Sequence, residues 1–278
     1  MTGNIKLLFS RKRRLLTIGI IMVLFLALIA LTADILEPNN PAKVTLADKN
    51  LPPNGAYPLG TDSLGRCILS RILDGAKSSL GIAFMAVGIS LIAGSLVGIV
   101  SGCTGGFIDT VFMRITDVFL SFPSIILALT VLAIAGPGFL NVVISLSAVG
   151  WTHFARLTRG IALTLKESEL VQGARAIGNN SFLIMLKYLF PQIAPKVIIL
   201  VPLDMSRTII SSAALSFLGL GIQPPMAEWG SMLNEARQFI RSSPHEILFP
   251  ALALFLSAFA FNVLGEGIRT YLDPYIPK

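Results

Sequence analysis

Long runs without a charged residue dominate the chain, and their lengths indicate its fold class. A helix needs about 20 mostly apolar residues to cross a bilayer. Val118–Thr152 is too long for one crossing and contains Gly136-Pro137-Gly138, which favours a break and a turn. The other runs of suitable length are Leu15–Ala33, Ser78–Ile108, a stretch near Val197–Leu218 and a stretch near Ile247–Leu264. The pattern predicts an all-α polytopic membrane protein with six transmembrane helices.

Composition supports this reading and excludes an ordinary soluble domain. The 278 residues are 54% hydrophobic and 13% charged, whereas soluble domains use about 25% charged residues. The formal net charge of +7 would suit nucleic-acid binding, but in so apolar a chain it more simply reflects Lys and Arg in cytoplasmic loops. We therefore expect membrane lipids and no nucleic acid. Cys67 and Cys103 are isolated thiols without the paired spacing of a zinc site or redox couple.

The distribution of Lys and Arg predicts how the segments are placed across the membrane. With both termini in the cytoplasm, the inner segments carry 14 basic residues and the outer segments 7, which satisfies the positive-inside rule. Arg11–Arg14 resembles the start of a secretory signal, but no convincing cleavage site follows, so we interpret the first helix as an uncleaved span. We predict a cytoplasmic N-terminus over 1–14, a first transmembrane helix over 15–33, an external segment over 34–79 and a membrane core over 80–278.

Residues 156–196 form a polar, basic stretch that we place in the cytoplasm. Gly178 is suited to end a helix in a left-handed turn, and Asn179–Ser181 to start the next helix. Pro191 and Pro195 are expected to interrupt the approach to the fifth span. This predicts two short helices presented to the cytoplasm. From the residues alone, a connector resting on lipid headgroups and a docking site for a partner are about equally acceptable interpretations.

Part of this stretch resembles the coupling-loop motif of ABC importer permeases, usually written Glu-Ala-Ala, three residues, Gly, nine residues, Ile-x-Leu-Pro. The matching residues here are Gln172-Gly173-Ala174, Gly178 and Tyr188-Leu189-Phe190-Pro191. Gln172, Gly173, Tyr188 and Phe190 depart from the motif, so Gly178 and Pro191 are the firmest matches. Further stretches resemble the dipeptide, oligopeptide and nickel branch of that family: Leu59–Arg66 with Ser70 and Arg71, Ser216–Gly221 with Pro224, Pro225 and Glu228–Gly230, and Asn262–Gly265 with Arg269 and Leu272–Pro274.

The resemblance implies the type I ABC importer permease fold with a cytoplasmic coupling helix, in the inner or plasma membrane of a bacterium. It implies a second, related permease that completes the translocation path as an unlike pair, two separate ATPase subunits, and an external or periplasmic binding protein. No Gly-x4-Gly-Lys-Ser/Thr phosphate loop is present, so ATP and Mg²⁺ are expected on the partner subunits, with no cofactor and no catalytic residue on this chain. The residues implied for ATPase coupling are Glu169, Gln172, Gly173, Ala174, Arg175, Gly178 and Pro191.

Polar residues within the apolar runs are candidates for lining the path. Asp204 and Arg207 lie three apart in the fifth span, where a charge normally faces the bundle interior or a watery cavity. They could equally pair with each other on adjacent turns. Ser212 and Asn262 complete this candidate set. Gly94, Gly98 and Gly102 recur every fourth residue, which predicts a flat ridge for close helix packing, with a hinge as the minority interpretation.

Two external stretches are candidates for docking the binding protein or for a scaffold lying on the membrane. The first contains Asp62 and Arg66, and we expect Thr61 or Asp62 to be the N-cap of a surface helix running through Ile72. The second contains Glu228 and Trp229, followed by a helix over 231–240. Since a metal site needs several nitrogen, sulfur or oxygen ligands, the distant His153 and His245 predict no metal site on this chain.

The cargo and the transport class remain alternatives at this stage. Ser212 occupies the position where the peptide branch commonly has glutamate, and Leu203-Asp204, Ala227–Gly230 and Asn234–Ile240 are more similar to nickel permeases. This favours nickel or a metal chelate, with dipeptides or oligopeptides as the alternative. A stand-alone secondary transporter or channel using Asp204 is a third possibility. An intramembrane hydrolase is weaker, because neither a Gly-x-Ser-x-Gly nor a paired-His pattern lies in a span.

Overall fold

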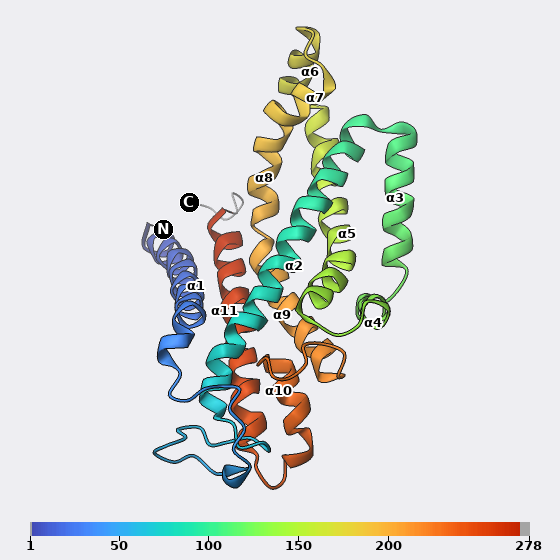
Figure 1. The fold of residues 1–278 in the computed structure, drawn as a ribbon. Coiled ribbons are helices and arrows are strands. Elements are labelled where there is room, and N and C mark those ends of the chain that lie inside the picture. Colours follow the sequence, from blue (N-terminus) through green and yellow to red (C-terminus); the bar gives the residue numbers. More distant parts are fainter. Residues whose placement is uncertain (1, 273–278) are drawn as a thin grey trace. The chain divides into compact units, whose positions relative to one another are not determined.

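The computed structural model describes residues 2–272, with side chains from residue 14 onward, and the regular elements of that part are helices. The prediction of an all-α chain is confirmed. The side chains of Arg11–Arg13, and Asp273 and Pro274 of the C-terminal motif, lie outside the described residues. The elements, shown in Figure 1, are α1 Thr2–Leu36, η1 Leu46–Asp48, α2 Ile68–Thr104, α3 Gly106–Leu120, α4 Ser124–Ala135, α5 Phe139–Lys166, α6 Glu169–Ala176, α7 Ser181–Ile184, η2 Met185–Leu189, α8 Phe190–Ile198, α9 Val201–Phe217, α10 Trp229–Ala236, η3 Arg237–Phe239 and α11 His245–Leu272.

The chain divides into two compact units, which are described separately. Unit 1 comprises the residues up to Phe84, Leu132–Val143, and the chain from Pro202 onward. Unit 2 comprises Met85–Val131 and Ile144–Val201.

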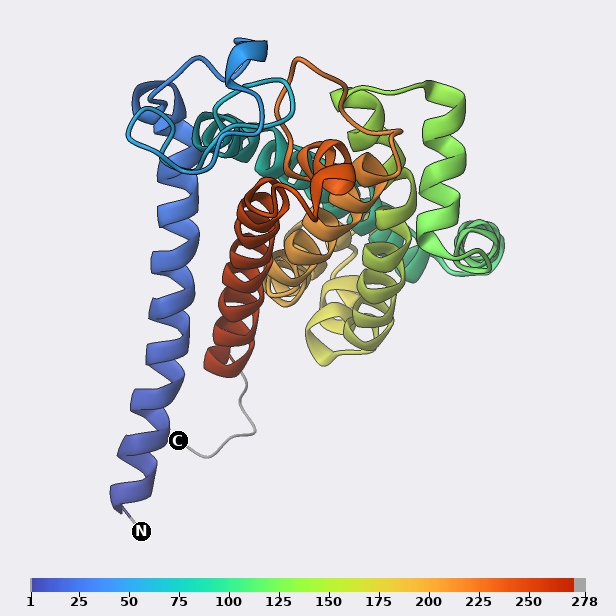
Figure 2. The ribbon, with the colours of Figure 1, turned by 90° about the horizontal axis from the view of Figure 1, so that it is seen from below.

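Close packing of α1 along α11 organises unit 1 (Figure 2). Gly19 lies so close to α11 that an added Cβ would be 2.5 Å from the Leu264 Cα. In return, a Cβ on Gly267 would be 2.7 Å from the Leu16 Cα. The two glycines therefore allow the helix backbones to approach closely, as small residues commonly do between membrane helices.

The predicted glycine ridge on α2 is confirmed as a packing surface in unit 2. An added Cβ would lie 2.2 Å from the Trp151 carbonyl oxygen at Gly94, and 2.4 Å from the Ala155 carbonyl oxygen at Gly98. At Gly102 it would lie 2.7 Å from the Ala162 Cβ. All of these neighbours are on α5, so the ridge is the face on which α2 and α5 touch.

The helices agree with the six predicted spans only in part. Four described helical segments are long and apolar enough to cross a membrane, or up to five if the bent pair α3 and α4 is one span. The break at Gly136-Pro137-Gly138 is confirmed, because α4 ends at Ala135 and α5 begins at Phe139. The run before this break does not form one helix, because α3 ends at Leu120, α4 begins at Ser124 and the two helices are bent by 91°. Pro123, just before α4, is compatible with this sharp change of direction.

The stretch 156–196 is far more helical than a connecting loop. α5 runs to Lys166, and the helical segment Ser181–Ile198 follows after α6. The prediction that Pro191 and Pro195 interrupt the chain is wrong, since Pro191 lies in the first turn of α8 and Pro195 lies inside it. The segment stays helical through both prolines, and the π-helical turn η2 lies immediately before α8. The interruption comes instead at Ile199 and Leu200, between α8 and α9.

Candidate functional site

The α6–α7 segment, defined as residues 168–184, is a helix–turn–helix at one end of unit 2. Figure 1 shows α6 and α7 at the tip of the pair formed by α5 and α8. Gly178 has a φ of +87°, the left-handed conformation that favours glycine. Asn180 is the N-cap of α7, and its Oδ1 accepts a hydrogen bond of 2.8 Å from the Leu183 backbone N–H. The predicted turn at Gly178 and the helix start after it are both confirmed.

This segment presents large apolar side chains to its surroundings. Ile177 is 77% exposed and Phe182 is 69% exposed, and Leu170 is also exposed. Val171 and Ala174 of α6 are buried. An exposed apolar patch flanked by polar groups is typical of a protein interaction site.

The structure divides the seven candidate coupling residues by accessibility. Ala174 is buried and therefore supports the fold of α6. The polar Gln172 side chain donates to the Glu167 carbonyl oxygen, so it closes the turn before α6. The accessible candidates are Glu169, Gln172, Gly173, Arg175, Gly178 and Pro191, and all but Pro191 lie on the α6–α7 segment.

An ion pair that the sequence analysis missed joins α3 to α5 near this segment. Arg159 Nε and Nη2 donate to Asp109 Oδ1 and Oδ2, each at 2.6 Å, and Ser101 Oγ donates to the same carboxylate. Such two-pronged pairing fixes both the distance and the orientation of the partners. It ties α5, which leads into α6, to α2 and α3. The sequence did show that Asp109 and Arg159 are charged residues next to apolar runs. Their separation in sequence, however, gave no reason to pair them with each other.

A buried charge cluster, defined as Asp62, Arg66, Arg71 and Glu235, joins the 61–71 stretch to α10 within unit 1. Arg66 reaches Asp62 at 2.7 Å and Glu235 at 2.6 Å. Arg71 reaches Glu235 at 3.1 Å and Asp62 at 3.5 Å. Both arginines are almost completely buried. Two cations and two carboxylates therefore balance one another, as buried charges require.

The predicted helix start at Thr61 or Asp62 is wrong, because α2 begins at Ile68. Asp62 instead closes a local turn: its Oδ1 accepts hydrogen bonds of 2.9 Å from the backbone N–H groups of Leu64 and Arg66. Thr61 accepts from the Leu51 N–H through its hydroxyl oxygen at 2.8 Å. These bonds hold the loop before α2, whereas the sequence pattern had suggested a helix.

Glu228 is the N-cap of α10. Its carboxylate accepts hydrogen bonds from the Gly230 and Ser231 backbone N–H groups at 3.0 and 2.8 Å, and from Ser79 Oγ at 3.4 Å. Burial raises the pKa of Glu228 above its usual value of 4.5, while the two backbone hydrogen bonds act in the opposite direction. The next residue, Trp229, is buried with Ile68, Ala76 and Met232.

The side chains of Asp62, Arg66, Glu228 and Trp229 are all buried. A docking surface needs accessible side chains, so these four side chains offer no direct contact in this structure, and a docking role for the two stretches stays a prediction. They instead build the scaffold that holds the 61–71 stretch and α10 together. α10 ends at Ala236 and is followed by the 3₁₀ turn η3, so the expected helix over 231–240 also differs in its ends.

The four candidate path-lining residues all lie on α9 and α11. Asp204 and Arg207 pair on adjacent turns, with Arg207 Nη1 at 3.5 Å from Asp204 Oδ1. Asn262 Nδ2 donates to Ser206 Oγ at 2.5 Å and so joins α11 to α9. Ser212 is buried and lines no accessible surface in this structure. The candidates that are accessible as whole residues are Arg207 and Asn262.

Histidine and cysteine side chains occupy ordinary packing positions. His153 lies on α5, and His245 is the first residue of α11 and packs against Gly60. Over residues 14–272, no three His, Cys, Asp or Glu side chains form a group suited to a metal ion. Both cysteines are free thiols.

Comparison with known proteins gives matches along nearly the whole chain. Residues 94–277 match the family described as binding-protein-dependent transport system inner membrane component. A glutathione transport system permease protein, GsiD of Pectobacterium atrosepticum, is 41% identical over 267 residues, or 96% of this chain and 88% of its own. A dipeptide transport system permease protein, DppC of Alkalihalophilus pseudofirmus, is 38% identical over 95% of this chain and 87% of its own. A nickel transport system permease protein, NikC of Escherichia coli, is 35% identical over 96% and 97%.

Solved structures share the fold at much lower sequence identity. A chain of the inward-facing MetNI methionine ABC transporter is 17% identical, with a TM-score of 0.58 over 73% of this chain and 96% of its own. A chain of an amino acid ABC transporter is 16% identical, with a TM-score of 0.54 over 70% and 91%. The fold is thus one found in ABC transporters.

Proposed function

The chain belongs to the family of binding-protein-dependent transport system inner membrane components, and from that premise we propose that it forms half of the translocation path of an ATP-driven importer. Its relatives are permease subunits of transport systems named for glutathione, dipeptides and nickel. The other half would be a related but different permease. The cargo would arrive from a binding protein outside the membrane.

The observation that carries this proposal is the exposed apolar surface of the α6–α7 segment. Ile177, Phe182 and Leu170 are accessible beside the polar Glu169 and Arg175. Burying such a surface in a groove of an ATPase subunit would stabilise the contact by the hydrophobic effect. The acidic Glu169 and basic Arg175 side chains would then determine how the segment fits at the rim.

Energy would come from ATP and Mg²⁺ bound by two partner ATPase subunits. Movement of those subunits on nucleotide binding would pull or push α6, and α5 and α8 would carry the displacement into the membrane. The paired Asp109 and Arg159 hold α5 to α3, so this end of unit 2 would move as one rigid body. Such rigid-body motion alternately opens a path to the two sides of the membrane.

We place both termini and the α6–α7 segment on the cytoplasmic side of a bacterial inner or plasma membrane. The excess of Lys and Arg in the corresponding segments supports this orientation. In this arrangement residues 34–79 lie outside, where the buried charge cluster would stabilise the face that receives the binding protein. The exposed Val44 and Leu46 side chains of that stretch are better candidates for the contact than the buried residues nearby.

We propose a short peptide as the cargo. The relatives named for glutathione and dipeptide transport match at 41% and 38% identity, compared with 35% for the one named for nickel transport. Nickel or a metal chelate is the second candidate, supported by the similarity of Leu203-Asp204 and Ala227–Gly230 to nickel permeases. A metal cargo would be carried as substrate within its chelate. The chelator would then supply the metal ligands, and this chain would not need to provide them.

Uptake measurements in cells lacking this chain, and in the same cells given it back, test the cargo. Labelled glutathione, a labelled dipeptide, and radioactive nickel with and without a histidine-type chelator would be compared. Restored uptake of glutathione or the dipeptide alone supports the peptide assignment. Restored nickel uptake with unchanged peptide uptake contradicts it and supports the second candidate.

Replacing Gly178 by leucine tests the ATPase-coupling assignment. A leucine side chain cannot adopt a φ of +87° without strain, so the turn and the presentation of α7 would change. We expect normal membrane insertion, lost transport, and ATPase subunits that are undocked or hydrolyse ATP without transport. Unchanged transport would contradict the assignment.

Purification of the intact importer tests the partners and the energy source. We expect two ATPase subunits, this chain and an unlike permease in one complex. A complex containing only copies of this chain with the ATPases would contradict the unlike pair. Transport by the purified chain in liposomes without ATPase subunits would instead support an ion-coupled secondary transporter.

A further inference from the structure

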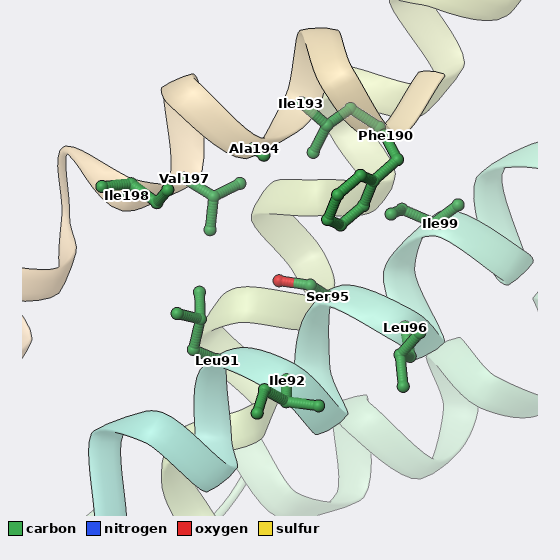
Figure 3. Close-up of a pocket in the computed structure, with 10 residues that line it drawn as sticks. All are labelled: Leu91, Ile92, Ser95, Leu96, Ile99, Phe190, Ile193, Ala194, Val197 and Ile198. Atoms are coloured by element: carbon green, nitrogen blue, oxygen red, sulfur yellow. The ribbon is translucent and has the colours of Figure 1, made fainter. Parts of the chain in front are cut away.

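Two cavities of the molecule differ in the side chains that line them. The groove between α2 and α8 of unit 2, shown in Figure 3, is lined by apolar side chains and the hydroxyl group of Ser95. A smaller cavity within unit 1, about 10 Å³ in volume, is lined in part by Asp62, Arg71, Glu235 and Glu246. This volume has room for about one water molecule. The ionisable lining makes the second cavity a place where a proton can be bound and exchanged.

Glu246 lies beside the buried charge cluster but is not ion-paired with it. It is in the first turn of α11, directly before the apolar run Ile247–Leu264, and it is 3% exposed. Its Oε1 has no hydrogen-bond partner among the described residues. The two arginines of the cluster are ion-paired with Asp62 and Glu235 instead. The Glu246 carboxyl group therefore lacks a cation of its own, which a buried carboxylate needs.

The balance of charge indicates the state of this carboxyl group. The two arginines of the cluster already balance the carboxylates of Asp62 and Glu235. An ionised Glu246 would add a third negative charge, and both of those carboxylates would repel it. The groups that favour its ionised form are uncharged: the Ser243 side chain and the Ser63 backbone N–H. The buried cluster is therefore neutral only when Glu246 carries a proton.

We propose that Glu246 is a proton-binding site on the external face of the chain, and that loss of its proton loosens the 61–71 stretch from α10 and α11. The negative charge left behind would repel Asp62 and Glu235, through which Arg66 joins the 61–71 stretch to α10. The Glu235 side chain is partly exposed, so protons reach the cluster from the surrounding water. The external location rests on the orientation given under the proposed function, whereas the proton site rests on the cluster itself.

Glu246→Gln tests the proton site, with Glu266→Gln, which changes an exposed residue of the same helix, as the matched control. A glutamate in an unfolded chain ionises at about pH 4.3, so above this pH the folded wild type holds a proton that the unfolded chain has released. The stability contributed by the site is fully present below about pH 4.3 and is lost as the pH rises until the folded protein releases the proton. Over this range the wild-type importer should lose about 2–4 °C in unfolding temperature per pH unit relative to Glu246→Gln. Glu266→Gln should follow the wild type.

Infrared spectroscopy measures the proton directly. At about pH 5.5, where an exposed glutamate is ionised, the purified importer with its partner subunits should show the carbonyl band of a protonated carboxylic acid. Part of this band should disappear in Glu246→Gln and remain in Glu266→Gln. His245, the titratable neighbour on α11, packs against Gly60 and is the same in all three proteins. Parallel unfolding curves for the wild type and Glu246→Gln, or an unchanged carboxylic-acid band, would overturn the proposal.

Cys67 reports whether the 61–71 stretch loosens. It lies in that stretch, is 2% exposed and is a free thiol, so an uncharged maleimide reaches it only when the stretch opens. Labelling would be measured on this chain in the intact importer, with Cys103→Ser in both proteins. The ratio of the wild-type rate to the Glu246→Gln rate should rise with pH, by up to about tenfold per pH unit. Equal rates at every pH would overturn the loosening. Because these measurements do not use transport, a wrong cargo or coupling assignment leaves them interpretable.

Discussion

The buried charge cluster of unit 1 and the α6–α7 segment of unit 2 differ in what they bury: the first buries charged side chains, and the second leaves apolar side chains exposed. In the cluster, Arg66 and Arg71 are buried yet each reaches two carboxylates. In the α6–α7 segment, Ile177 and Phe182 are apolar yet lie exposed. In the first region the charges are paired within the chain, although Arg71 Nε and Nη1 have no hydrogen-bond partner among the described residues, whereas the second region has apolar surface still to bury. A change in the first should therefore affect stability, and a change in the second should affect assembly.

The largest effect is expected when Arg66 is replaced by methionine. Removing one partner of a buried ion network leaves the remaining carboxylates without compensation, which costs about 3–5 kcal/mol. Asp62 and Glu235 would each lose their shortest ion pair. We expect little folded protein in the membrane, and a strongly lowered midpoint in thermal unfolding of the fraction that folds.

Arg156→Met is the matched control for this experiment. Arg156 is half exposed and pairs with Asp117, also about half exposed, at 2.6 Å. Exposed pairs contribute about 0–1 kcal/mol, so this variant should unfold close to the wild-type temperature. Equal losses in Arg66→Met and Arg156→Met would show that burial does not distinguish the two pairs.

A smaller loss is expected from Gly98→Leu on the glycine ridge. The first added carbon would lie 2.4 Å from the Ala155 carbonyl oxygen, so α2 and α5 would have to separate. Overpacking of this kind costs about 1–3 kcal/mol. Thermal unfolding of the purified protein would measure it.

Gly88→Leu provides the comparison on the same helix. Nothing lies within 4 Å of a Cβ added at Gly88, and leucine favours helix by up to about 1 kcal/mol over glycine. This variant should be as stable as the wild type or slightly more so. A destabilised Gly88→Leu together with a normal Gly98→Leu would contradict the assignment of the ridge as the packing face.

The fold was largely predictable because apolar runs and turn residues act locally. The break at Gly136-Pro137-Gly138 and the left-handed turn at Gly178 follow from the conformational preferences of glycine and proline, and both are present. The bend between α3 and α4 was missed because an apolar run reads the same whether it crosses straight or turns. Pro191 was misjudged because a proline in the first turn of a helix looks, in sequence, like one that ends it.

The exposure of a candidate residue was predictable where it follows from the local pattern of a helix. It was unpredictable where it depends on partners that are distant in sequence. Exposure of most of the α6–α7 candidates follows from polar residues around a short helix. Burial of Glu228 depends on Ser79, about 150 residues away in sequence, which donates to its carboxylate. The pairing of Asp109 with Arg159 across α3 and α5 likewise depends on tertiary packing that no spacing rule encodes.

A substitution at an exposed apolar position should affect assembly rather than stability, unlike the substitution of Arg66. Ile177→Asp changes a side chain that is 77% exposed, so the free energy of unfolding should change by no more than about 0.5 kcal/mol. The same change puts a charge where the ATPase subunit is proposed to bury apolar surface, so association of the ATPase subunits should weaken and transport should fall. Co-purification of the subunits and uptake by cells would measure the two effects.

Leu46→Asp serves as the control for Ile177→Asp. Leu46 is also an exposed apolar side chain, but it lies in η1 on unit 1. It should leave ATPase association unchanged. If both variants bind the ATPase subunits normally, the exposed surface of the α6–α7 segment is not the contact.

The smallest effect, and the sharpest test of the buried region, is the pH dependence removed by Glu228→Gln. Burial raises the pKa of Glu228 above 4.5 in the folded protein, so between pH 4.5 and that raised pKa the folded state binds a proton that the unfolded state does not. The contribution of this group to stability is therefore fully present below about pH 4.5 and is lost as the pH rises through the raised pKa. Glutamine keeps an oxygen that can accept from the Gly230 and Ser231 N–H groups and carries no charge. The unfolding temperature of the Glu228→Gln protein should consequently decline less than that of the wild type as the pH rises from 4.5 to 8. At the acidic end the two proteins should unfold at similar temperatures. Since all other carboxylates are the same in both proteins, the difference between the two curves isolates Glu228. Parallel curves would mean that the Glu228 carboxylate carries its charge within the fold at no net cost, because its hydrogen bonds balance its burial.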